Sequence, residues 1–152
     1  MSIAKKDNCN FTFSSDHNDV DVKKVQFWLC ECSWSKAIPV STVEKMIKSS
    51  FCVSAFNENN EQIGFSRAIT DYCTYAYICD VYVDQDYRGN GIARLMLNIM
   101  LEVNDFRKFK HLSLIATPES QSLYESLMFK KTHPDLPHME ICDLNTYVKN
   151  RK

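Results

Sequence analysis

The sequence predicts one domain of mixed α+β structure, in which helices cover a central sheet. The chain has 152 residues, of which 45% are hydrophobic and 24% are charged. These fractions are typical of a soluble globular domain. Apolar, β-branched and aromatic runs at 50–57, 63–70 and 75–83 have strand character. Apolar residues elsewhere recur at helical spacing, so we expect helices packed on a sheet within a single domain over residues 1–152.

The first third of the chain predicts a short strand and two helices. The alternating patch from Phe11 to Phe13 is typical of an edge strand. Helical spacing of apolar residues predicts a helix over 19–32, with Asp19 or Asp21 as its acidic cap. A second short helix follows a proline, and we expect Ser41 to cap it.

The middle of the chain predicts a hairpin and a long strand. The segments SFCVSAFN and IGFSRAIT flank ENNEQ (58–62), whose composition favours a hairpin loop. The segment YAYICDVYV (75–83) is the longest β-branched and aromatic run, so we place it at the centre of the sheet.

The last third predicts two helices and two strands. Apolar residues from Ile92 to Val103 follow one helical face. A short buried strand at 111–116 precedes a helix that Thr117 caps and that runs to Leu127. The segment MEICDLNTYV (139–148) is a candidate for the last strand.

Charge and cysteine content exclude several classes of protein. The net charge is −1, from 18 basic and 19 acidic residues, so no basic surface for nucleic acid is expected. We find no signal peptide and no apolar run long enough for a membrane span, and we expect a cytoplasmic protein. The seven cysteines lack C-x-x-C spacing and are interpreted as free, partly buried thiols. His133 and His138 flank a proline-bounded loop, so no metal site is expected.

The stretch VYVDQDYRGNGIARLML (81–97) holds two of the three glycines of the chain where a strand gives way to a helix. A helix N-terminus offers unpaired amides and partial positive charge, and glycines let a phosphate approach that backbone. Arg88 and Arg94 add charge for such a ligand. The alternative is a plain turn with a glycine at a left-handed position. The P-loop pattern and the dinucleotide pattern are both absent.

Arg88, Gly91 and Ala93 match the pattern [QR]-x-x-G-x-[GA] on a strand, turn and helix. Together with TDYCTYAYICDVYV (70–83) and LYESLMF (123–129), this pattern resembles the GNAT superfamily of N-acetyltransferases, over about residues 11 to 147. The resemblance implies a mostly antiparallel, twisted sheet of six to seven strands, splayed at its middle and flanked by about four helices.

The resemblance also implies acetyl-CoA as cosubstrate. The strand edge at Val81, Tyr82 and Val83 would pair with the pantetheine arm, and one amide there would polarise the thioester carbonyl. Thr117 stands near the far pantetheine contacts, where relatives often have asparagine. The turn that would hold the pyrophosphate comprises Arg88, Gly89, Asn90, Gly91, Ile92, Ala93 and Arg94.

Two residues are candidates for catalysis. Tyr124 matches the tyrosine that serves the family as general acid, although it could also be a helix tyrosine packed on the sheet. Asp80 is the candidate base, but a structural carboxylate or one that orients the amine fits equally well. Glu31 and Asp71 are weaker candidates for the base. Met128 stands where most relatives have glycine, so we expect the turn there to form without a positive φ.

The expected reaction is direct attack by a primary amine on acetyl-CoA in a ternary complex. The acceptor is a small-molecule or peptide amine that the sequence does not specify, and Trp34 could line its pocket. The protein is expected to be a monomer or homodimer. The alternatives are an acyl-CoA-binding regulator of the same fold without turnover and, more remotely, a nucleotide-binding module.

Overall fold

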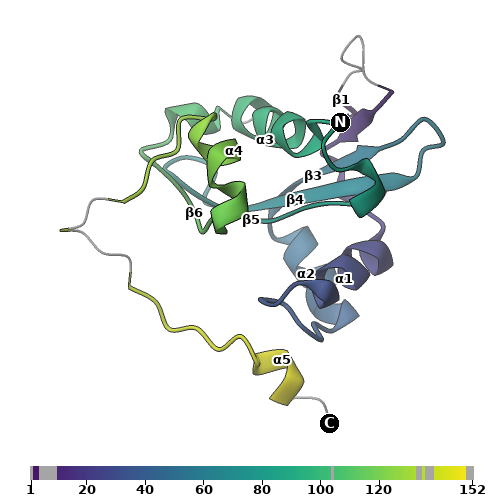
Figure 1. The fold of residues 1–152 in the computed structure, drawn as a ribbon, viewed down its shortest axis with the longest axis horizontal. Coiled ribbons are helices and arrows are strands. Elements are labelled where there is room, and N and C mark those ends of the chain that lie inside the picture. The colour runs from purple at the N-terminus through teal and green to yellow at the C-terminus, as the bar shows by residue number, and fades with distance from the viewer. Residues whose placement is uncertain (1, 4–9, 104, 133–134, 136–138, 150–152) are drawn as a thin grey trace.

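The computed structural model describes residues 2–3, 10–103, 105–132, 135 and 139–149. Its strands form one sheet in the order β1-β2-β3-β4-β5-β6 (Figure 1). The strands are β1 (Ser2–Ile3), β2 (Thr12–Ser14), β3 (Phe51–Phe56), β4 (Gln62–Thr70), β5 (Tyr75–Val83) and β6 (His111–Leu114).

The sheet is mostly antiparallel, as expected. Each strand from β1 to β5 pairs antiparallel with the next, and β5 pairs parallel with β6. Five strands have three or more residues, and β1 adds only two. The mixed α and β class is confirmed, whereas the expected count of six to seven strands is not.

The centre of the sheet is not β5, contrary to the prediction. Every residue of β3 is buried, whereas in β5 only Ala76 and Ile78 are. The register of β5 with β6 covers only Tyr75–Ile78 of β5, so the rest of that edge has no strand partner among the described residues. The apolar run in β5 therefore marks a strand whose second half lines an opening.

Two helices cover one face of the sheet, α1 (Val22–Glu31) and α2 (Val40–Lys48) (Figure 1). Asp21 is the N-cap of α1 and accepts a hydrogen bond from the Lys24 amide, which confirms one of the two predicted caps. The prediction for Ser41 was wrong, because the N-cap lies two residues earlier, at Pro39, and makes no side-chain cap hydrogen bond. The fixed φ of proline suits the start of a helix.

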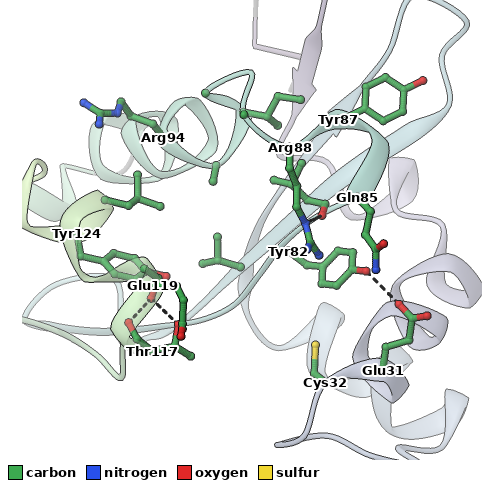
Figure 2. A pocket seen from close by; sticks show the side chains of 18 of the residues that line it. Glu31, Cys32, Tyr82, Gln85, Tyr87, Arg88, Arg94, Thr117, Glu119 and Tyr124 are labelled. Atoms are coloured by element: carbon green, nitrogen blue, oxygen red, sulfur yellow. Dashed lines mark hydrogen bonds between the residues drawn. The ribbon is translucent and has the colours of Figure 1, made fainter.

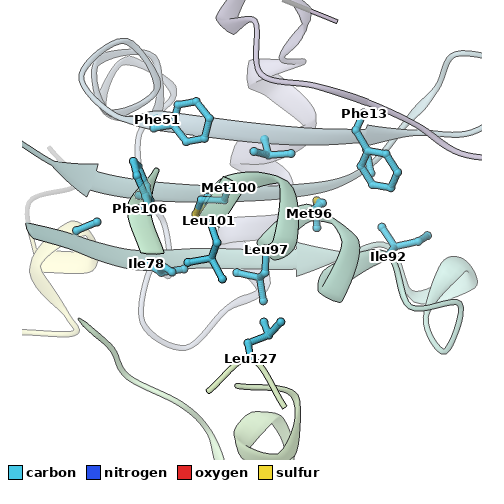
Figure 3. Close-up of a cluster of buried hydrophobic side chains, with 14 of the residues drawn as sticks. Phe13, Phe51, Ile78, Ile92, Met96, Leu97, Met100, Leu101, Phe106 and Leu127 are labelled. Atoms are coloured by element: carbon cyan, nitrogen blue, oxygen red, sulfur yellow. The ribbon is translucent and has the colours of Figure 1, made fainter. Parts of the chain in front are cut away.

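The opposite face carries α3 (Ile92–Val103), which supplies five of the sixteen buried residues of the core shown in Figure 3. Met96, Leu97 and Met100 are fully buried between the helix and the sheet. The apolar spacing that predicts this helix therefore corresponds to its buried face.

The chain after β6 forms a 3-10 turn (Pro118–Ser120), with Thr117 at its N-cap, followed by α4 (Gln121–Glu125). Met128 follows α4 with φ of 76°, so the expectation that this turn avoids a positive φ was wrong. The last predicted strand was also wrong. Residues 139–144 run without regular structure, and the short α5 (Thr146–Lys149) follows. The described residues thus contain five α-helices where about four were expected.

Candidate active site

The glycine turn follows β5 directly and leads into α3. A 3-10 turn at Gln85–Tyr87 precedes Gly89 and Gly91, whose φ angles are 81° and 75°. A side chain at either glycine would meet no atom within 4 Å. Both glycines are therefore needed for the backbone conformation and leave the turn open to a ligand. The Asn90 side chain donates to the Tyr87 carbonyl at 3.0 Å, which closes the turn from within.

Arg88 lies folded back from the turn. Its Nε donates to the Val83 carbonyl at 3.0 Å, and its guanidinium lies over the Tyr82 ring at 5.4 Å (Figure 2). Arg94, in the first turn of α3, lines a cavity that Arg88 also lines and that is described below. Both arginines thus line the cavity beside the helix N-terminus, where a phosphate would be favoured, although Arg88 now binds the Val83 carbonyl.

A β-bulge interrupts β5 beside this turn. Phe65 pairs with Tyr82 and Arg67 pairs with Cys79, so two residues of β5 lie opposite the single residue between them in β4. Asp80, in the bulge, has a left-handed φ of 52°, which aspartate tolerates better than most residues. The extra residue lets Tyr82 pack against α1, while Val81 and Val83 pack toward α3.

The bulge is held by an ion pair. Oδ2 of Asp80 accepts from Nε of Arg67 at 2.7 Å, and the side chains are only 7% and 13% exposed, respectively. Arg67 also donates to the Ser50 hydroxyl at 3.1 Å. Burial alone would lower the pKa of the guanidinium, but the charge attraction of Asp80 and its hydrogen bond outweigh that effect, and the pKa is raised. No local pattern indicates Arg67, because its partner depends on the register of two strands.

Tyr124 lies in α4, across the opening from β5 (Figure 2). It is 9% exposed, and its ring meets Phe129 edge to face with centroids 6.1 Å apart. Burial raises the pKa of the phenol, so the hydroxyl stays protonated at neutral pH. A buried, protonated phenol beside an open cavity has the properties of a proton donor.

One cavity of about 1030 Å³ joins these parts. It includes the predicted residues at the β5 edge, in the turn, at the helix N-terminus and on α4, but not Asp80 or Asn90. The predicted residues that line it are Val81, Tyr82, Val83, Arg88, Gly89, Gly91, Ile92, Ala93, Arg94, Thr117 and Tyr124. Most of the predicted residues thus line one continuous cavity.

The same cavity extends to the loop after α1, where Glu31, Cys32, Ser33 and Trp34 line it. Oε2 of Glu31 accepts from the Tyr82 hydroxyl at 3.0 Å. The Tyr82 ring in turn stacks on Trp28, with centroids 5.1 Å apart and planes at 21°. Trp34, which the sequence suggests for an acceptor pocket, lines this cavity. Glu31, a weak candidate in the sequence, lies in the cavity.

The thiols and the remaining candidates have structural roles. Burial raises the pKa of the Cys52 and Cys79 thiols to about 12 each, which keeps both protonated and unreactive. Asp71 closes the turn between β4 and β5, where its carboxylate accepts from the Thr74 hydroxyl and from three backbone amides. Asp71 does not line the cavity.

Among the described residues, no group of histidine, cysteine and acidic side chains could hold a metal ion. His133 and His138 lie outside the described residues. No helix in the described part of the chain is long and apolar enough to cross a bilayer.

Comparison with known proteins identifies the family. The model of the acetyltransferase (GNAT) domain matches residues 14–144. The chain therefore belongs to the GNAT acetyltransferases. A relative at 30% identity is the uncharacterized N-acetyltransferase ycf52 of Gracilaria tenuistipitata var. liui, with 84% of this chain and 70% of the relative aligned. The histone acetyltransferase TAP1 of Glycine max is 28% identical, over 76% of this chain. The chain spans about half of that relative, 54% of its length.

Solved structures agree with the GNAT assignment. A GNAT-family protein from Xanthomonas campestris pv. campestris superposes with a TM-score of 0.85 at 28% identity, over 91% of this chain and 97% of the other. An acetyltransferase from Clostridium acetobutylicum, solved with acetyl-CoA, shares the fold at a TM-score of 0.64 and 17% identity, over 86% of this chain and 95% of that one.

Proposed function

We propose that this GNAT domain transfers the acetyl group of acetyl-CoA to a primary amine by direct attack in a ternary complex. The observation that carries the proposal is the single cavity that joins the glycine turn, the open edge of β5 and Tyr124. Its volume is at the upper end of the range of about 300–1,000 Å³ for small-molecule sites, as a coenzyme together with an acceptor requires.

The residues at the turn fit the diphosphate of such a coenzyme. The positive φ angles of Gly89 and Gly91 leave the backbone open, and α3 presents its N-terminal amides there. Arg88 would exchange its contact with the Val83 carbonyl for a phosphate oxygen. That exchange would also free the β5 edge at Val83, where a pantetheine amide could pair.

Acetyl-CoA would supply a thioester-activated acetyl group in the gap between β5 and α4. An amide of Val81 or Val83 would polarise the carbonyl, and the Tyr124 hydroxyl would donate its proton to the departing thiolate. The raised pKa of Tyr124 keeps that proton available across the neutral range. The attacking nitrogen must be neutral, and water in the open cavity would remove its proton.

Asp80 is better suited to shaping the site than to acting as its base. Its carboxylate is held by Arg67 at 2.7 Å, and it does not line the cavity. A base must reach the proton that it removes. We therefore assign Asp80 to holding the bulge that separates Tyr82 from Val81 and Val83.

The proposal is tested by measuring thiol release from acetyl-CoA with a panel of small amines, polyamines and peptides, alongside direct titration of acetyl-CoA. Thiol release that depends on an amine supports the proposal. Tight binding of acetyl-CoA with no release for any amine would instead support a coenzyme-binding regulator. Absence of binding would refute both.

A further inference from the structure

Glu31 lies in the cavity described above, at the end away from Tyr124 (Figure 2). It is the last residue of α1. A carboxylate at a helix C-terminus is disfavoured by the helix dipole, so its position does not stabilise α1. Glu31 is also exposed to solvent within the cavity, where a ligand can reach it.

Tyr82 fixes the direction of the Glu31 carboxylate. Its hydroxyl donates to Oε2 at 3.0 Å, and its ring is held against Trp28 in α1. Burial, and then the hydrogen bond to Glu31, raise the pKa of the Tyr82 phenol, so this hydroxyl remains a donor at neutral pH. One oxygen of Glu31 is thus held, and the other is left for a ligand.

The surroundings of Glu31 suit a cation. The Trp34 side chain lines this end of the cavity, is 44% exposed and offers an aromatic face. Burial raises the pKa of the neighbouring Cys32 thiol to about 11, so it adds no negative charge of its own. The Arg88 guanidinium also lies near this end, over the Tyr82 ring at 5.4 Å, and a coenzyme phosphate would offset its charge.

We infer that Glu31 binds a second positive charge of the acceptor, so that the preferred acceptors are small diamines or polyamines. The inference rests on the proposed function, because it names the acceptor of that reaction. Glu31 and Tyr124 lie at opposite ends of the cavity (Figure 2). Glu31 therefore selects the acceptor by the charge remote from the reacting nitrogen, and it takes no proton from that nitrogen.

The test compares putrescine, a four-carbon diamine, with butylamine, its monoamine counterpart. Both are titrated calorimetrically into the CoA-loaded protein, so that the readout does not require turnover. We expect putrescine to bind about tenfold to a hundredfold more tightly, since charge-assisted hydrogen bonds are the strong ones. In Glu31→Gln the two amines should bind equally, and Tyr82→Phe should lose a smaller part of the preference.

The matched control is Glu125→Gln. Glu125 is also the last residue of a helix, but it lines a second cavity of about 590 Å³ on the other side of Tyr124. This variant should keep the full preference for putrescine. An equal affinity of the wild type for both amines, an unchanged preference in folded Glu31→Gln, or a lost preference in Glu125→Gln would each overturn the inference. Failure of the proposed function is read separately, as absence of thiol release with every amine.

Discussion

Asp80 and Arg67 form a buried ion pair across the bulge, with 2.7 Å between Oδ2 and Nε. The two residues stand on neighbouring strands, and they hold Cys79 and Tyr82 on the same face although three positions separate them. The course of β5 beside the cavity therefore depends on a charge pair that does not itself line the cavity.

Asp80→Asn should lower the free energy of unfolding strongly and have little effect on kcat. It leaves the Arg67 guanidinium buried without its partner, which costs about 3–5 kcal/mol in comparable pairs. Urea unfolding measures this loss. The double variant Asp80→Asn with Arg67→Met should be less destabilised than the sum of the single variants, because the buried charge is removed. A stable Asp80→Asn protein that loses turnover with an altered pH profile would identify Asp80 as the base instead.

Gly91→Ala should weaken the affinity for acetyl-CoA by at least about tenfold. The added methyl group meets no atom of the protein within 4 Å, but it stands where a phosphate would approach the backbone. The left-handed φ of 75° also costs about 1–2 kcal/mol for alanine.

Asn60→Ala controls for this strain. Asn60 has a φ of 59° in the hairpin between β3 and β4, outside the cavity. Calorimetric titration should show normal acetyl-CoA affinity in Asn60→Ala. Equal affinities for both variants and the wild type would argue against a phosphate site at the turn.

Tyr124→Phe should lower kcat by roughly a hundredfold, with acetyl-CoA affinity nearly unchanged. The change keeps the ring and its contact with Phe129 and removes only the proton donor. General acid catalysis contributes about 10²–10⁴-fold, and a thiolate is an easy leaving group, so the lower figure applies. Steady-state kinetics with any accepted amine gives the answer. A kcat within about threefold of the wild type would assign Tyr124 to packing alone.

Met128→Gly should stabilise the protein by about 1 kcal/mol. Met128 adopts a φ of 76° after α4, a conformation that costs most residues energy and glycine almost none. Its side chain is 76% exposed, so its removal sacrifices little packing. Thermal unfolding should show a higher Tm. A lower Tm would mean that the methionine side chain makes a contribution larger than the backbone strain.

Asp71 should give the protein a measurable dependence of stability on acid pH. The Thr74 hydroxyl and three backbone amides hold the pKa of its carboxyl well below its usual range. A depressed pKa in the folded state means that this contribution is present above the unfolded value near 3.8 and is lost as pH falls toward the folded value. The Tm difference between wild type and Asp71→Asn should thus be largest above ~pH 5 and shrink below ~pH 4. A difference that is constant with pH would contradict this account.

The part of the site that was predictable from sequence is local. Arg88, Gly89 and Gly91 lie within four residues. The two glycines by themselves indicate a positive φ, and the arginine indicates a positive charge. The strand and the helix on either side have clear periodicity, so the turn could be placed between them.

The parts that were missed depend on pairing between distant segments. Arg67 meets Asp80 from 13 positions away, and Glu31 meets Tyr82 from 51 positions away. The residues at 139–144 alternate like a strand, but a strand also needs a neighbour, and here Met139 and Ile141 stay exposed. The residue pattern of a segment does not indicate whether a neighbouring strand is available to pair with it.

The short ladder between β5 and β6 is the weakest join among the longer strands of the sheet. It has four register pairs, whereas β3 with β4 and β4 with β5 have six each. Of these three ladders it should be the first to separate in a local opening event. A coenzyme bound at the neighbouring edge, Val81–Val83, would add its binding free energy to the folded state, so it would oppose that separation.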